Sequence, residues 1–175
     1  MTKRYALNWS IWIGVVAGIY VLLYAISPLY QYSVMPCTFV ALPMFFQAGA
    51  KKEEIVDYCS SAVAGVAWAV LYIYLIGVLI AQGLSVSLSN AIVVCAATIV
   101  LCAFHFIVTK RYVLTKVPMM FGALASTFFA GSSKWPALMA TLCFGVLLAY
   151  LCQLGTCFLN ESGHWKLPGE KRKHV

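Results

Sequence analysis

Long apolar stretches separated by short clusters of charged residues make up the chain. Four intervals contain no Asp, Glu, Lys or Arg: Arg4 to Lys51, Asp57 to Lys110, Lys116 to Lys134, and Lys134 to Glu161. A helix needs about 17–25 residues to cross the hydrocarbon core of a bilayer, and each interval is at least about that long. The pattern predicts an all-α, polytopic transmembrane protein.

The apolar positions divide into six predicted helices. Their ranges are roughly Trp9–Ile26, Val34–Ala48, Tyr58–Ile80, Leu88–Val108, Val117–Ala130 and Pro136–Leu159. The first is too long for the apolar part of a signal peptide, so we interpret it as a retained helix. The second and fifth runs are short, and such runs form short, tilted or re-entrant segments.

Basic residues occur in alternate loops, which predicts the orientation. Three loops carry only Lys134; the N-terminus and the other loops carry Lys3, Arg4, Lys51, Lys52, Lys110, Arg111, Lys116, Lys166, Lys171, Arg172 and Lys173. This alternation fits six crossings with both termini in the cytoplasm, and it favours full crossings by the short runs. It also accounts for the net charge of +7 without a nucleic-acid partner.

The second and fifth runs match each other without gaps at a shift of 82 residues. Segment 36–52 and segment 118–134 share eight of seventeen positions, including one Pro, one Gly, one Lys and two Phe. We interpret this match as an internal duplication. Because each half holds three helices, the second half must lie upside down relative to the first.

The predicted architecture is therefore one six-helix transmembrane domain, residues 1–160, followed by a basic cytoplasmic tail, 161–175. Repeat one covers about 8–83 and repeat two about 87–160. Inverted repeats recur in transporters, whose sites lie where short or interrupted helices meet near the midplane. The candidate residues of the short helices are Pro36, Thr38, Phe39, Phe46, Gln47 and Gly49, with Pro118, Phe121, Ser126, Phe128 and Gly131.

The remaining chemistry is sparse. The seven cysteines form no CxxC pair and predict neither a metal site nor a disulfide framework. His105 is the one ionisable candidate within a span, either titrating in function or hydrogen-bonded structurally. No nucleophile–base pair is visible, so we expect no enzyme, no cofactor and no metal.

These observations favour a passive channel or facilitator for a small neutral or weakly polar solute. A lining of aromatic, apolar and neutral polar groups excludes ions through their desolvation cost. We expect Phe39, Phe46, Phe121 and Phe128 to form a paired aromatic constriction between the repeats. The alternatives are a secondary transporter with alternating access, or a scaffold or accessory subunit without transport. The expected partners are the lipid bilayer, the solute and, as an open possibility, further copies of the chain.

Three segments carry a family resemblance: Pro36-Cys-Thr-Phe39, Ala64–Ala69, and Val117–Ala123 followed by Phe128–Gly131. They resemble the YcdZ-like bacterial inner-membrane proteins, a domain of unknown function numbered 1097. The likeness runs from the first span to the sixth. It implies a small helical protein of the bacterial inner membrane and supplies no functional residues.

Overall fold

The computed structural model describes residues 1–109 and 113–166. Lys110 and Arg111 of the fourth loop, and the tail residues from Leu167 onward, lie outside this part of the chain. Within it the fold is all-helical, and β pairing is limited to an isolated bridge between Leu159 and Trp165.

Each of the six predicted runs corresponds to one α-helix, although α1, α3, α4 and α6 begin before the predicted start. The helices are α1 (Lys3–Ala25), α2 (Thr38–Gln47), α3 (Ile55–Ala81), α4 (Val86–Ala103), α5 (Val117–Ala130) and α6 (Trp135–Leu154). The helical segments containing α1, α3, α4 and α6 are long and apolar enough to cross a membrane. The chain is thus a multi-pass helical membrane protein.

Helices α2 and α5 are the short ones, as predicted. With 10 and 14 residues they are about 15 Å and about 21 Å long, less than the roughly 30 Å of a bilayer core. A 3₁₀ turn, Met35–Cys37, precedes α2, and the left-handed glycines Gly49 (φ 91°) and Gly131 (φ 93°) follow α2 and α5. Glycine adopts this conformation without the steric cost of a Cβ.

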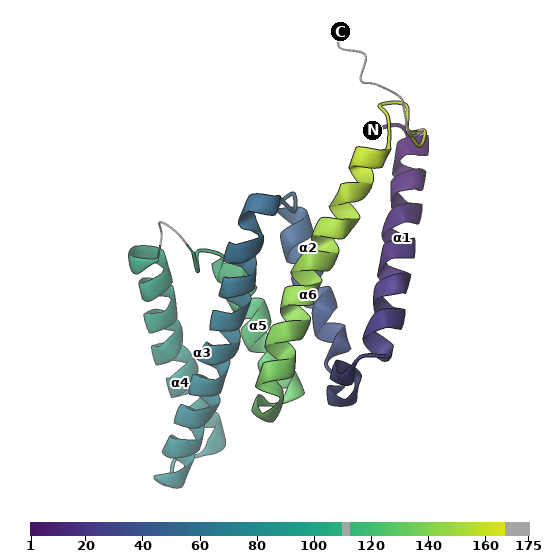
Figure 1. Cartoon of the computed structure of the whole chain (residues 1–175). Helices are drawn as coiled ribbons and strands as arrows, with labels where there is room; N and C mark the ends of the chain where they lie inside the picture. The colour runs from purple at the N-terminus through teal and green to yellow at the C-terminus, as the bar shows by residue number, and fades with distance from the viewer. Residues whose placement is uncertain (110–112, 167–175) are drawn as a thin grey trace.

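Successive helices run in opposite directions (Figure 1). One end of the molecule holds the start of α1, the α2–α3 connection, the start of α5 and the end of α6. We call it the basic end because it carries Lys3, Arg4, Lys51, Lys52 and Lys116. The α1–α2, α3–α4 and α5–α6 connections lie toward the opposite end, which we call the far end. Lys134 is the single charged residue of these three connections.

Four helices form the centre of the molecule. The most extensive packing is between α3 and α5 and between α2 and α6, and α3 also packs against α6. Helices α1 and α4 lie at opposite edges, α1 mainly against α6 and α4 against α3 (Figure 1). The central buried cluster accordingly draws Phe45, Ala62, Met119 and Leu142 from four different helices.

A glycine allows α3 and α5 to approach closely. A Cβ on Gly65 would lie 2.3 Å from the carbonyl oxygen of Met120 and 2.8 Å from Cβ of Ala123. Small residues at helix contacts allow this backbone approach, which drives packing in lipid.

The contact between α6 and α2 is built in the same way. A Cβ on Gly145 would lie 2.4 Å from the carbonyl oxygen of Thr38 and 2.8 Å from Cβ of Ala41. Thr38 and Ala41 are the positions that correspond to Met120 and Ala123 at the shift of 82 residues. The two major interfaces therefore use positions that correspond at this shift.

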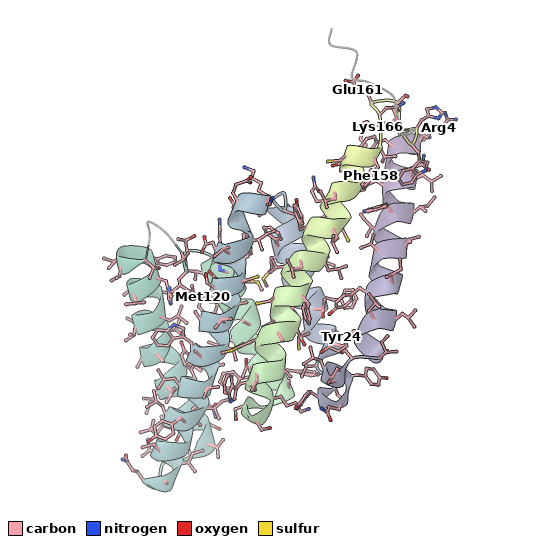
Figure 2. All side chains as sticks on the ribbon, in the orientation of Figure 1. Arg4, Tyr24, Met120, Phe158, Glu161 and Lys166 are labelled. Atoms are coloured by element: carbon pink, nitrogen blue, oxygen red, sulfur yellow. The ribbon has the colours of Figure 1, made fainter. Side chains whose placement is uncertain are left out.

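The segment after α6 folds back onto α1. The side-chain amide of Asn8 donates to the carbonyl of Gly163 at 2.8 Å, and Arg4 Nη1 lies 2.6 Å from Nε2 of His164. Arg4, Phe158 and Lys166 gather at the basic end (Figure 2). Residues 161–166, the start of the predicted tail, therefore pack against the helical domain.

Candidate functional site

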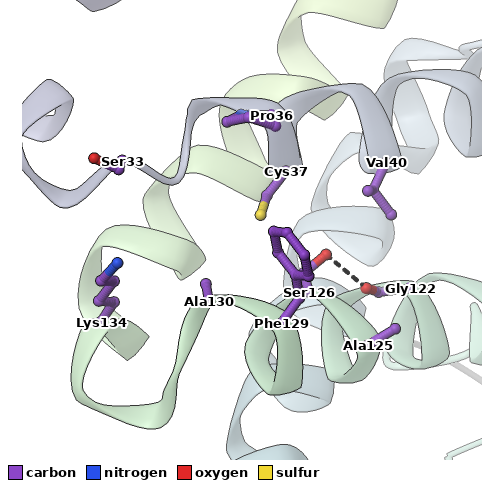
Figure 3. Close-up of a pocket in the computed structure, with 10 residues that line it drawn as sticks. All are labelled: Ser33, Pro36, Cys37, Val40, Gly122, Ala125, Ser126, Phe129, Ala130 and Lys134. Carbon is purple, nitrogen blue, oxygen red and sulfur yellow. Dashed lines mark hydrogen bonds between the residues drawn. The ribbon is translucent and has the colours of Figure 1, made fainter.

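A cavity of about 400 Å³ lies between the start of α2 and the end of α5 (Figure 3). This is the junction of the two short helices that the sequence singled out. Its lining consists of small, apolar and neutral polar residues with one cation: Ser33, Pro36, Cys37, Val40, Gly122, Ala125, Ser126, Phe129, Ala130 and Lys134. A cavity of this size can hold a small organic molecule.

The cavity exists because the two short helices differ at matching positions. On α2, Met44 reaches across to α5, where a Cβ on Gly122 would lie 2.5 Å from the Met44 methyl carbon. The residue of α5 that corresponds to Met44 is Ser126, which is smaller and lines the cavity. The long side chain of Met44 thus fills the space between α2 and α5 at one end of their contact. The short side chain of Ser126 leaves the corresponding space at the other end open.

Ser126 and Cys37 provide the inner polar groups. Ser126 is 5% exposed and donates its hydroxyl proton to the carbonyl of Gly122 at 2.8 Å. A serine hydroxyl has one proton and two acceptor lone pairs. Ser126 therefore offers only acceptor capacity to a molecule in the cavity.

Ser33 and Lys134 both line the same side of the cavity, on the left in Figure 3. Ser33 ends a 3₁₀ turn with φ 54°, a left-handed conformation that is costly for a residue with a Cβ. Lys134 lies at the N-terminus of α6 and is partly buried. Residues held in such conformations often cluster at ligand sites.

The other candidates from the short helices are placed differently. Thr38 is buried, and its hydroxyl lies 2.6 Å from that of Tyr20, so it closes a contact between α1 and α2. Gln47 and Gly49 are exposed at the basic end, away from the cavity lining. Pro36 and Pro118 occupy the starts of their helical segments, and only Pro36 lines the cavity.

The four phenylalanines do not form the expected constriction. Phe39, Phe121 and Phe128 are 43%, 37% and 40% exposed, and Phe46 stacks on Trp9 of α1 with ring centroids 5.5 Å apart. None of the four lines the cavity between α2 and α5. On α2 and α5 these side chains instead face outward or toward α1. The aromatic residue that borders the cavity is Phe129, which is itself 90% exposed.

His105 is a buried, fully hydrogen-bonded residue. Trp68 Nε1 donates to His105 Nε2 at 3.0 Å, and His105 Nδ1 lies 3.0 Å from the carbonyl oxygen of Leu114. Since Nε2 accepts, Nδ1 carries the proton and donates to that carbonyl. His105 sits in a π-helical turn, Phe104–Val108, apart from the α2–α5 cavity.

A polar cluster at the basic end was not predicted from the sequence. Asp57 accepts from the backbone N–H of Thr115 at 2.9 Å and from its hydroxyl, and Lys116 Nζ lies 3.1 Å from Glu54 and 3.9 Å from Asp57. These contacts join the starts of α3 and α5. We call Glu54, Asp57, Thr115 and Lys116 the basic-end clasp. In the sequence, Asp57 only marks the start of an uncharged interval.

A family model described as "Protein of unknown function (DUF1097)" matches residues 10–156. The chain belongs to this family. The match spans all six helices and includes the whole lining of the cavity. No curated protein and no solved structure matches the chain.

Proposed function

We propose that this protein is a facilitator that passes a small neutral or weakly polar solute across a membrane, along a path between two inverted three-helix repeats. The setting we propose is the bacterial inner membrane, with the basic end and both termini in the cytoplasm. This orientation follows the preference of Lys and Arg for cytoplasmic loops.

The cavity between α2 and α5 is the observation that carries the proposal. It lies where the two copies of the duplicated segment meet, and it combines small polar groups with apolar walls. Among its lining residues only Lys134 is charged, so an ion entering further would lose hydration without compensation. The matching contacts of Gly65 and Gly145 support the inverted repeat on which the path depends.

Passage also requires movement at the opposite end. Met44 fills the space beside Gly122, and the basic-end clasp ties α3 to α5. A cavity on the far side of such a closure is the arrangement that alternating access would produce in one of its states. This observation favours a secondary transporter as the second candidate function, with the same cavity as its site.

Stopped-flow light scattering on proteoliposomes tests the proposal. The screen uses water, glycerol, urea, short aldehydes and short acids, on the natural protein, on Ser126→Met and on Ser133→Met. Ser126→Met places the residue of the other copy in the cavity, whereas Ser133 is exposed and outside the lining. We expect fast swelling for at least one solute, lost in Ser126→Met and kept in Ser133→Met.

The kinetics separate the two candidate functions. A facilitator gives a rate that rises in proportion to the solute gradient, whereas a transporter saturates and responds to an ion gradient. Absence of acceleration for every solute would refute the facilitator, and absence of uptake under an ion gradient as well, with folded protein verified in the vesicles, would refute both. Equal swelling in the two serine variants would remove the cavity from the path.

A further inference from the structure

Lys134 is an isolated charge at the far end of the molecule. The described acidic residues, Glu53, Glu54, Asp57 and Glu161, belong to the basic end, and both ion pairs of the described chain involve Lys116 there. A cation at a membrane interface without an acidic neighbour attracts anions from solution. Lys134 therefore gives the cavity a preference for negative charge.

The lining is polar on one side and apolar on the other. Ser33 and Lys134 both lie on the left of the cavity in Figure 3, while Val40, Ala125 and the 90% exposed Phe129 provide apolar surface to their right. An ammonium and a hydroxyl can both donate to a carboxylate. The apolar part offers contact to a short hydrocarbon chain.

Ser126 sets the orientation of such a molecule. Because its proton is held by the carbonyl of Gly122 at 2.8 Å, Ser126 turns only lone pairs toward the cavity. A carboxylate beside these lone pairs would be repelled. The negative group must therefore lie at Ser33 and Lys134, with its chain toward Val40 and Phe129.

The two copies of the duplicated segment differ at the residues that create this cavity. Val40, Met44 and Gln47 of the first copy correspond to Gly122, Ser126 and Phe129 of the second, whereas Pro36, Ala41 and Gly49 have identical counterparts. The matched Ala41 and Ala123 lie in the two glycine contacts, whereas the differences at Met44 and Ser126 leave a space on one side only.

We propose that the α2–α5 cavity is a binding site for a short-chain carboxylate, whose negative group lies at Lys134 and Ser33 and whose chain lies along Val40 and Phe129. The inference names the class of solute, and its passage across the membrane rests on the proposed function. Binding of the carboxylate itself does not depend on transport. For passage the carboxylate oxygen takes a proton from a hydronium ion, which leaves as water, and the neutral acid moves on. Lys134 stays an ammonium throughout.

Binding of butyrate to purified protein in zwitterionic nanodiscs, followed by titration calorimetry at neutral pH, tests the proposal. We expect saturable binding that weakens at least about tenfold in Lys134→Gln, the loss of one charge-assisted hydrogen bond. Lys52→Gln is the matched control, since Lys52 aligns with Lys134 at the shift of 82 residues but lies at the basic end. Butyramide, with the same chain and no charge, should bind more weakly than butyrate to the natural protein.

Several results would overturn the site. Equal butyrate binding in Lys134→Gln and Lys52→Gln would remove Lys134 from it, and absence of butyrate binding to folded protein would refute it outright. A lipid could also occupy the α2–α5 cavity. If phosphatidylglycerol in the nanodisc abolishes butyrate binding and its phosphate binds in a Lys134-dependent manner, the cavity holds a lipid headgroup and the proposal is wrong. Butyrate binding without flux would refute the proposed function alone, and glycerol flux without butyrate binding would refute the site alone.

Discussion

Replacing Gly65 by alanine should disrupt the close packing of α3 against α5 and destabilise the protein. The new Cβ would lie 2.3 Å from the carbonyl oxygen of Met120 and 2.7 Å from its Cα, whereas ordinary van der Waals contact begins near 3.4 Å. Both obstacles are backbone atoms, so no side chain can move aside. Helix α5 must therefore retreat by roughly an ångström along its contact with α3.

Overpacking of this kind costs about 1–3 kcal/mol, and a backbone obstacle places the variant near the upper end of that range. For a chain of this length such a loss lowers the melting temperature by roughly 5–10 °C. Gly77→Ala is the matched control, because it lies on the same helix and its Cβ meets nothing within 4 Å. Alanine there gains up to about 1 kcal/mol of helix propensity.

Thermal unfolding in detergent can be followed with a maleimide that fluoresces on reaction with thiols. Cys37 and Cys152 are buried and free, so they react only when the helices separate, whereas the exposed Cys95 and Cys157 react beforehand and set the baseline. We expect Gly65→Ala to unfold well below Gly77→Ala, and Gly145→Ala to behave like Gly65→Ala because its Cβ meets Thr38 in the same way. Melting of Gly65→Ala within about a degree of Gly77→Ala would show that α3 and α5 do not pack as described.

Three further predictions concern the other named residues. Trp68→Phe leaves the Nε2 acceptor of His105 unpaired and should lower the free energy of unfolding by about 1–3 kcal/mol in the thiol assay. Nitrogen NMR of histidine-labelled natural protein should show the proton on Nδ1 of His105, and a proton on Nε2 would contradict the assignment. Asp57→Asn breaks the basic-end clasp and should destabilise the protein by about 1–2 kcal/mol. Glu53→Gln removes an exposed charge that lies outside the ion pairs of the described residues, so this variant should melt like the natural protein. Phe128→Ala should leave solute flux unchanged, because Phe128 is 40% exposed and outside the cavity; a changed flux would restore it to the path.

The positions of the helices could be predicted because lipid imposes a simple rule. A segment that crosses the hydrocarbon region must satisfy its own backbone hydrogen bonds and carry few charges, and both demands are visible in the sequence. The short lengths of α2 and α5 and the stops at Gly49 and Gly131 follow from the same pattern. Each of these features depends on residues close together in the chain.

The direction of each side chain could not be predicted in the same way. Helices α2 and α5 are apolar on all sides, so periodicity does not distinguish a face toward lipid from a face toward protein. Phe128 and Phe129 are neighbours, yet only Phe129 lines the cavity. The basic-end clasp was missed for a related reason, because Asp57 and Thr115 are 58 residues apart and meet only after α3 packs on α5.

The site itself emerges from comparing the two copies of the duplicated segment rather than from either copy alone. Positions that the copies share, such as Ala41 and Ala123, lie in the two glycine contacts that hold α2 and α5 to the long helices. Positions at which they differ, such as Met44 and Ser126, decide which side is filled and which is open. Under the proposed inverted repeat both classes of position are needed: matching contacts preserve the scaffold, while one changed side chain per contact is enough to give the two ends of the molecule different chemistry.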